Sequence, residues 1–219
     1  MKALLITIDG PAGAGKTTVS RALADRLGYR YIDTGALYRG VALAARMRGV
    51  DPKNDDGLKN LCRSLDLNFV QHTDGLRLYL NGEDISDRIR TPEITMLASA
   101  ISARPVVRKF LLDLQKDLGK EKAAVFEGRD MGTVVFPKAD VKFFLDASAR
   151  TRAQRRYAEQ KPKSSQSLDE VERDIQRRDR NDSTRDLAPL KPAADAIVID
   201  STQMKVDEVV EFMIAHIGQ

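Results

Sequence analysis

Residues that bind metals or form disulfides are scarce in this chain. Among its 219 residues are one cysteine, Cys62, and two histidines, His72 and His216. A lone cysteine excludes an internal disulfide and any cluster of cysteine ligands, and the two histidines are too far apart for a local metal-ligand motif. Cys62 lies in a stretch whose apolar residues recur at helical spacing, so we expect it to be buried packing and not a nucleophile.

Long apolar segments are also missing. The apolar run at residues 3–8 is too short for the core of a signal peptide and ends at Asp9. No stretch approaches the roughly 20 apolar residues of a membrane span. We therefore expect a cytoplasmic protein that makes no membrane contact.

Charged residues, in contrast, are abundant. They make up 31% of the chain, and 36 Lys and Arg against 32 Asp and Glu give a net charge of +4. The excess is compatible with a solvated basic surface or with an anionic ligand such as a nucleotide or nucleic acid. Charge alone does not choose between these interpretations.

The order of apolar segments predicts an α/β fold. Short strand-like runs at 4–8, 31–32, 123–126, 141–145 and 196–199 alternate with stretches of helical periodicity. Such alternation is typical of a doubly wound, mostly parallel sheet, here of five strands, which binds ligands at the carboxyl ends of its strands. Helices are predicted at 17–27, 37–47, 92–103, 105–118, 151–160, 206–217, and from a capping box at Ser167 onward.

One segment breaks this alternation. Strand-like runs at 67–70 and 76–80 flank Thr73-Asp74-Gly75, which predicts an antiparallel hairpin. We therefore predict a small β-containing insert at about residues 50–92.

Residues 10–17 match the phosphate-binding loop (P-loop) pattern G-x-x-x-x-G-K-[ST] at every fixed position, between a strand and a helix. Its glycines let successive backbone N–H groups face one anion, and the following helix directs its positive end there. Lys16 can reach the β- and γ-phosphates, and the Thr17 hydroxyl can bind Mg²⁺. The loop predicts a nucleoside triphosphate ligand but does not separate a hydrolase from a kinase.

Residues 33–39 follow the second strand at the ligand-binding edge. Thr34 can cap the next helix, and Asp33 can either cap it or bind Mg²⁺ through water. Arg39 lies in the first turns of that helix, where its charge opposes the helix dipole, and this favours a phosphate partner.

Charged side chains also follow the third core strand. Arg129 and Asp130 are neighbours, and neighbouring side chains in extended chain seldom point the same way, so a bridge between them is disfavoured. Farther along, Arg178, Asp182 and Arg185 share one face at helical spacing. That face is compatible with a salt-bridged surface or with a ligand site.

A second basic cluster consists of Arg152, Arg155 and Arg156, beside a polar stretch at 161–166 that we expect to be mobile. The cluster is compatible with a basic surface or a nucleic-acid patch. It is equally compatible with arginines that a closing segment brings to a transferred phosphoryl group.

Together these segments resemble the bacterial cytidylate kinase family, over almost the whole chain. The most specific matches are EGRDMGTVVFP at 127–137 and the R-x-x-x-D-x-x-R spacing at 178–185. The other matching segments are GPAGAGKTT at 10–18, DTGALYR at 33–39, ASAISARPVVR at 98–108, TRAQRR at 151–156, RDRNDSTRDLAPL at 178–190 and PAADAIVIDST at 192–202.

The resemblance implies a P-loop nucleoside monophosphate (NMP) kinase that moves a phosphoryl group from MgATP to CMP or dCMP. Residues implied to bind ATP are Gly10, Pro11, Ala12, Gly13, Ala14, Gly15, Lys16, Thr17, Thr18 and Arg152, with Mg²⁺ held by Thr17 and, through water, by Asp33. Those implied to hold the acceptor phosphate are Thr34, Arg39, Arg129 and Arg185. Those implied to bind the cytosine are Ser99, Arg108 and Asp130, and those implied to bind the sugar are Arg178 and Asp182. Those implied to act on the transferred group are Lys16, Arg129, Arg185, Arg155 and Arg156.

The resemblance also implies a division into three parts. These are a P-loop core (1–33, 104–150 and 186–219), an NMP-binding region (34–103) that contains the β insert, and a mobile lid with flanking helices (151–185). Two departures are modest: Thr34 and Glu127 stand where many relatives have serine and aspartate. The second puts a metal role at Glu127 in doubt, and none is assigned.

Two rival functions remain open at this point. The first is a P-loop kinase for another nucleotide or metabolite, which would not need Ser99, Arg108 and Asp130 together. The second is a nucleotide-gated nucleic-acid binder, but aromatic residues are only 5% of the chain and offer few stacking platforms. We expect a monomer that binds small molecules and no nucleic acid.

Overall fold

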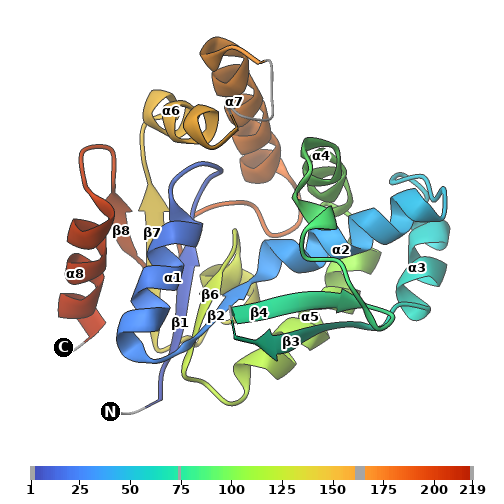
Figure 1. Ribbon diagram of the computed structural model, residues 1–219, viewed down its shortest axis with the longest axis horizontal. Coiled ribbons are helices and arrows are strands. Elements are labelled where there is room, and N and C mark those ends of the chain that lie inside the picture. Colours follow the sequence, from blue (N-terminus) through green and yellow to red (C-terminus); the bar gives the residue numbers. More distant parts are fainter. Residues whose placement is uncertain (1–2, 74, 161–165, 218–219) are drawn as a thin grey trace. The chain divides into compact units, whose positions relative to one another are not determined.

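The computed structural model describes residues 3–73, 75–160 and 166–217 (Figure 1). The chain divides into two compact units. The P-loop unit consists of Met1–Tyr31 and Glu121–Gln219, and the insert unit of Ile32–Lys120. The three-part division with a separate lid stays a prediction.

A five-stranded sheet carries the strand order β2-β6-β1-β7-β8. Strand β1 pairs in parallel with β6 and β7, and β7 pairs in parallel with β8. This confirms the predicted doubly wound fold, in which the P-loop follows the central strand. The strands are β1 (Leu5–Asp9), β2 (Arg30–Asp33), β6 (Ala124–Glu127), β7 (Val141–Asp146) and β8 (Ile197–Asp200).

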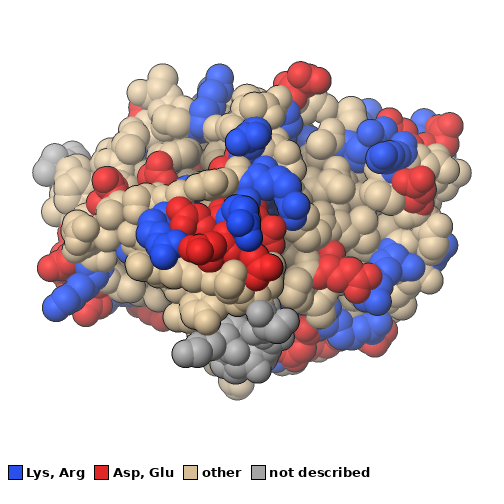
Figure 2. All heavy atoms as spheres, turned by 90° about the horizontal axis from the view of Figure 1, so that it is seen from above, with Lys and Arg blue, Asp and Glu red and all other residues tan. Residues whose placement is uncertain are grey.

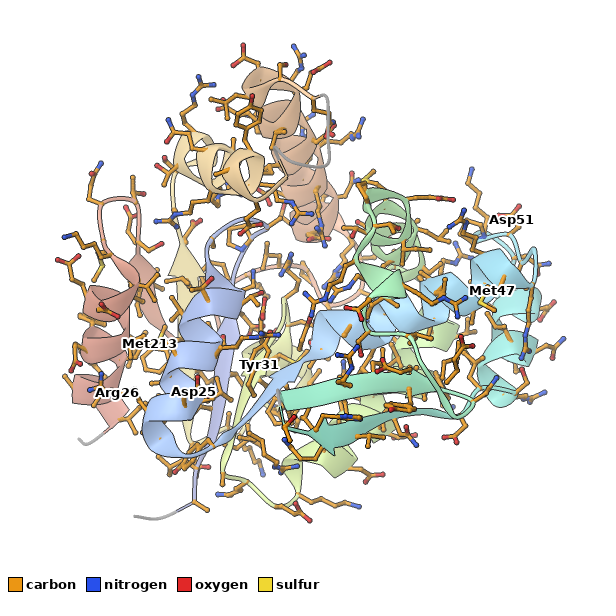
Figure 3. The ribbon with its side chains drawn as sticks, in the orientation of Figure 1. Asp25, Arg26, Tyr31, Met47, Asp51 and Met213 are labelled. Atoms are coloured by element: carbon orange, nitrogen blue, oxygen red, sulfur yellow. The ribbon has the colours of Figure 1, made fainter. Side chains whose placement is uncertain are left out.

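Helices α1 (Lys16–Leu27) and α8 (Val206–Ile217) cover the sheet of the P-loop unit. Every residue of β1 is buried, as a strand covered on both faces requires. Met213 of α8 is fully buried and lies between α8 and α1 (Figure 3). An exposed ion pair between Arg26 and Glu211, 2.8 Å apart, joins the same two helices.

Two charged helices, α6 (Ala149–Gln160) and α7 (Leu168–Thr184), pack on each other through Ala153, Val171 and Ile175. The predicted capping box is confirmed, because Ser167 and Glu170 bond to each other's backbone N–H. Of the stretch predicted to be mobile, residues 161–165 lie outside the described residues. Basic and acidic side chains lie beside one another on the face of the molecule in Figure 2 and form no single basic patch there.

The insert unit surrounds helix α2 (Thr34–Met47), most of whose residues are buried. The predicted hairpin is confirmed as β3 (Leu67–His72) with β4 (Gly75–Leu80), although its Asp74 lies outside the described residues. Cys62 is buried, which raises the pKa of its thiol to about 11 and confirms its packing role. The remaining elements are α3 (Asp55–Arg63), a short third strand β5 (Glu83–Asp84), a 3₁₀ turn (Arg88–Arg90), α4 (Pro92–Ile101) and α5 (Pro105–Gly119).

Among the described residues, no helix combines the length and apolar character that crossing a bilayer needs.

Candidate active site

The P-loop turns sharply from β1 into α1. Gly10, Gly13 and Gly15 all have positive φ. A Cβ at Gly10 would lie 2.0 Å from the carbonyl oxygen of Leu145, so the backbone passes too close to β7 for a side chain. Helix α1 begins at Lys16 with no side-chain cap. Its first N–H groups are therefore available to an anion, as the sequence predicts.

Lys16 is buried within this turn, and its Nζ donates to the carbonyl oxygen of Pro11 at 2.7 Å. Burial, followed by the charges of Arg129 and Arg178, lowers the pKa of Lys16 to about 7, against the opposing effect of Glu127. The positive charges of Arg129 and Arg178 thus disfavour the charged form of Lys16. Such an arrangement is stable once a polyanion lies among them.

Glu127, at the end of β6, faces the start of α1. The Thr17 hydroxyl donates to its Oε1 at 3.0 Å, and the Tyr31 hydroxyl donates to its Oε2 at 2.5 Å. Tyr31, seen beside α1 in Figure 3, also lies 5.2 Å below the guanidinium of Arg21. Sequence reasoning did not assign a role to Glu127 or Tyr31, because a Glu–Tyr contact across 96 residues leaves no local pattern.

This neighbourhood fits Mg²⁺. No group of three or more His, Cys, Asp or Glu able to hold a metal occurs in the described part of the chain. Mg²⁺ does not require one, since it keeps several waters and takes phosphate oxygens together with one or two protein oxygens. The Thr17 hydroxyl and Glu127 carboxylate are hard oxygen donors of that kind.

Asp9, the last residue of β1, is a buried carboxylate that sequence reasoning treated only as the end of an apolar run. It accepts hydrogen bonds from the backbone N–H groups of Met131 at 2.9 Å and Gly132 at 2.7 Å. Burial raises the pKa of Asp9 to about 6, and the two N–H groups limit that rise. An acidic residue inside a fully buried strand was the signal that could have identified it.

The neighbours Arg129 and Asp130 have different partners, as their adjacency suggests. Arg129 Nε lies 3.1 Å from Asp182 Oδ2, and Asp130 Oδ1 lies 3.6 Å from a terminal nitrogen of Arg185. Asp130, Asp182 and the Arg185 side chain are almost fully buried. The structure thus joins the segment after β6 to α7 and to the loop that follows α7 through two largely buried ion pairs.

One prediction for this cluster is wrong in its geometry. Arg178 and Asp182 do lie on one face of α7, with 4.0 Å between Nε and Oδ2. Arg185 does not, because α7 ends at Thr184 and Arg185 has extended backbone angles. Its Nε donates to the carbonyl oxygen of Ala188 at 2.7 Å. The backbone of the loop after α7, and not the spacing of residues on a helix, places Arg185 beside Asp130.

The three arginines of the predicted basic cluster, all on α6, divide into two groups. Arg152 donates to the carbonyl oxygen of Ala12 at 3.0 Å and to Asp179 at 2.5 Å. Arg155 donates to the carbonyl oxygen of Ala14 at 3.1 Å. Both therefore hold the P-loop backbone. Arg156 instead forms an ion pair with Glu159 at 3.3 Å near the surface.

In the insert unit, Asp33 caps α2 by accepting from the Ala36 N–H, and it forms a 2.6 Å ion pair with Arg39. Burial alone would raise the pKa of Asp33, but the Arg39 guanidinium holds it below its ordinary value. The expected capping role of Thr34 is wrong: Thr34 is the buried first residue of the helix. The sequence also gave no structural partner for Arg39, which the structure supplies in Asp33.

The residues that the resemblance implies to read the base lie on three separate segments. Ser99 lies on α4 and Arg108 on α5, in the insert unit. Arg108 donates to the carbonyl oxygen of Ser102 at 3.1 Å, and its guanidinium lies 5.8 Å from the Tyr38 ring centre. Asp130 belongs to the P-loop unit.

Comparisons with known proteins agree with this architecture. Residues 6–219 match the family model described as cytidylate kinase. A cytidylate kinase of Geobacter sulfurreducens is 53% identical over 97% of this chain and 91% of its own length. One of Pasteurella multocida is 45% identical over 99% of this chain and 96% of its own. A solved shikimate kinase of Bacteroides thetaiotaomicron shares the fold, with a TM-score of 0.53 at 13% identity over 100% of both chains.

A parallel sheet whose central strand leads into a P-loop defines a P-loop nucleotide-binding protein. The family match extends almost from end to end, at an identity well above the level at which membership is in doubt. The chain belongs to the cytidylate kinase family, which confirms the resemblance seen in its motifs.

Proposed function

We propose that this chain transfers the γ-phosphoryl group of MgATP to CMP and dCMP, giving ADP and the diphosphate. Phosphorylation of CMP by ATP is the reaction of its family. The observation that carries the proposal is the buried Lys16 of the P-loop, whose pKa is lowered to about 7 by burial and by the charges of Arg129 and Arg178. Phosphate groups from two substrates supply the missing negative charge there.

On the donor side, the N–H groups of residues 10–18 cradle the ATP phosphates, and Lys16 leaves the Pro11 carbonyl to bind them. Thr17 and, through water, Asp33 would hold Mg²⁺, which would neutralise charge on the ATP phosphates. Arg152 and Arg155 keep the P-loop backbone in shape from α6, a role supported by their contacts with Ala12 and Ala14. With Arg156 they also belong to the segment that closes over ATP.

On the acceptor side, the CMP phosphate is held by Thr34, Arg39, Arg129 and Arg185. Asp130 accepts from the cytosine amino group, while Arg108 and Ser99 bind its O2 and N3 side. Uracil has a carbonyl where cytosine has the amino group, so the carboxylate of Asp130 would be left facing an acceptor. Buried polar groups without partners are costly, and the result is discrimination against UMP. Arg178 and Asp182 bind the sugar and accept either ribose or deoxyribose.

The reaction is a direct in-line displacement. An oxygen of the CMP phosphate attacks the γ-phosphorus, a new P–O bond forms, and the bond to the bridging oxygen of ADP breaks. The attacking oxygen is already ionised, so no general base is needed. Catalysis therefore consists of positioning and of neutralising charge by Lys16 and the arginines, while closure keeps water out.

The test is a coupled assay of ADP release with MgATP and each of CMP, dCMP, UMP, AMP and GMP. Fast release with CMP and dCMP alone is the expected result. Equal release with every acceptor, or release with none, contradicts the proposal and favours a kinase for another metabolite.

We further propose that the protein acts as a cytoplasmic monomer that binds no nucleic acid. Sedimentation equilibrium measures the mass of the particle against the 24.3 kDa of one chain. A filter-binding titration at low salt measures any affinity for single-stranded DNA or RNA, which would fall steeply as salt rises.

A further inference from the structure

Asp9 occupies a junction in the P-loop unit. Its backbone ends β1 and leads directly into Gly10, the first residue of the P-loop. Its carboxylate contacts a different segment, because both of its oxygens accept hydrogen bonds from the turn that follows β6. The bonds come from the N–H groups of Met131, 2.9 Å from Oδ1, and Gly132, 2.7 Å from Oδ2. One residue therefore joins the donor loop to the segment that carries Arg129 and Asp130.

The segment it holds is an unusual turn. Residues Met131–Val135 form a single π-helical turn. The carbonyl oxygen of Asp130 accepts from the N–H groups of Val134 and Val135, at 2.9 and 3.2 Å. The first N–H groups of any such turn have no carbonyl partner within it, and here the Asp9 carboxylate satisfies two of them.

The same segment is tied to β1 at its start. The N–H group of Gly128 donates to the carbonyl oxygen of Ile8 at 3.1 Å. Gly132 lets the turn approach closely: a Cβ there would lie 3.1 Å from Thr7 Oγ1 and 3.4 Å from Asp9 Oδ2. Residues 128–132 are thus held against the last two residues of β1, and Arg129 and Asp130 lie between the tethered points.

We infer that Asp9 is a positioning residue of the kinase reaction, which fixes Arg129 and Asp130 relative to the P-loop and so sets acceptor affinity and base selectivity. The inference rests on the proposed role of Asp130 in reading the cytosine. A carboxylate suits this task because each of its oxygens accepts one N–H, and hydrogen bonds to a charged acceptor hold geometry more firmly than neutral ones. Asp9 itself contacts neither substrate in this scheme.

The most direct variant is Asp9→Asn, which keeps the size of the side chain. An amide offers one acceptor oxygen, and its NH₂ group then faces the second backbone N–H. The matched control is Thr7→Val, two residues earlier on β1. Thr7 is also fully buried, and its Oγ1 has no hydrogen-bond partner among the described residues, so that substitution removes no bond.

Four quantities are measured at pH 8: amide hydrogen exchange at residues 131 and 132, the KM for CMP, the KM for ATP, and the ratio of kcat/KM for CMP to that for UMP. In Asp9→Asn we expect faster exchange, a KM for CMP raised about tenfold or more, and a selectivity ratio lowered about tenfold. The KM for ATP stays within about twofold. Thr7→Val matches the wild type in all four.

A second variant protects the test against misfolding of the first. Gly132→Ala places a methyl group 3.1 Å from the Thr7 hydroxyl, 3.2 Å from Lys142 Cδ and 3.4 Å from the Asp9 carboxylate, and should displace the turn while Asp9 is intact. It should raise the KM for CMP in the same direction by a smaller factor.

Wild-type CMP affinity and selectivity in Asp9→Asn would overturn the inference, whatever the exchange rates. A KM for ATP that rises as much as that for CMP would also overturn it, because Asp9 would then be a general support of the fold. Failure of the proposed role of Asp130 has a different signature: Asp130→Ala would keep the wild-type ratio of kcat/KM for CMP to that for UMP. In that case the KM for CMP and the amide exchange rates of Asp9→Asn, compared with the wild type, still test whether Asp9 positions the turn.

Discussion

The guanidinium of Arg152 bonds to the carbonyl oxygen of Ala12 in the middle of the P-loop, at 3.0 Å. The same guanidinium nitrogen lies 2.5 Å from Asp179 of α7, and the side chain is 8% exposed. A carbonyl that points to Arg152 cannot point at a phosphate, so this contact keeps the N–H side of the loop facing the ligand. It also couples the loop to the two charged helices.

We predict that Arg152→Met destabilises the protein by about 3 kcal/mol, because Asp179 and the Ala12 carbonyl lose a buried partner. The KM for ATP rises with it. The measurement is urea denaturation together with initial rates. Arg150→Met is the control on the same helix, since its pairs with Asp169 and Glu172 are more exposed and contribute little to stability. Equal effects of the two variants would contradict the role given to Arg152.

Lys16→Met should abolish most turnover without unfolding the protein. In the absence of nucleotide, Lys16 is a buried amine whose pKa is lowered from 10.5 to about 7. With this lowered pKa, Lys16 binds fewer protons in the folded state than in the unfolded state, so its burial opposes folding. The free energy of unfolding therefore rises through this group as the pH increases from about 7 to 10.5, the range in which Lys16 is protonated only in the unfolded chain. Thermal melting at pH 7 should thus show a variant at least as stable as the wild type. A large loss of stability would mean that Lys16 is a structural residue.

Binding of ATP should take up protons. At pH 8 Lys16 is mostly neutral in the free protein, because its pKa is about 7, whereas phosphate oxygens favour the charged form. We expect uptake of close to one proton per ATP, measured by calorimetry in buffers of different ionisation heat.

The control for proton uptake is Lys16→Arg. Its guanidinium stays charged at every accessible pH, so ATP binding should carry no uptake through this position. Identical uptake by the two proteins would show that Lys16 is already charged in the free state.

The sequence was sufficient for the fold and for the family. Buried strands, a P-loop and an Asp-Gly hairpin are local patterns, and each was confirmed where it was expected. The third strand of the insert, β5, is only two residues long and has no periodicity to find.

Pairings across long stretches of chain could not be predicted in this way. The bond between Asp9 and Gly132 spans 123 residues, and that between Arg152 and Ala12 spans 140. Neither leaves a local signal. Arg185 shows the opposite failure: a helical spacing was present, but the helix ends at the residue before it. Arg39 was judged to lack a structural partner because Asp33 was considered only as a cap or a metal ligand.

The Mg²⁺ concentration that the reaction requires should depend on the Thr17 hydroxyl. Thr17→Val removes the group that donates to Glu127 at 3.0 Å and that is proposed to bind the metal. The Mg²⁺ concentration for half-maximal rate should rise about tenfold or more, while Thr17→Ser stays near the wild type. Chelation with EDTA should stop turnover by both. An unchanged Mg²⁺ requirement in Thr17→Val would remove Thr17 from the metal site.

The central claim is tested most directly by the ratio of kcat/KM for CMP to that for UMP in Asp130→Ala. Asp130 is buried beside Arg185, at the end of the segment that Asp9 holds. We predict that the ratio falls by about a hundredfold, because the carboxylate that accepts from the cytosine amino group is gone. ATP affinity should change little. An unchanged ratio, with both acceptors slowed equally, would contradict the reading of cytosine by Asp130 and assign the selectivity to other residues.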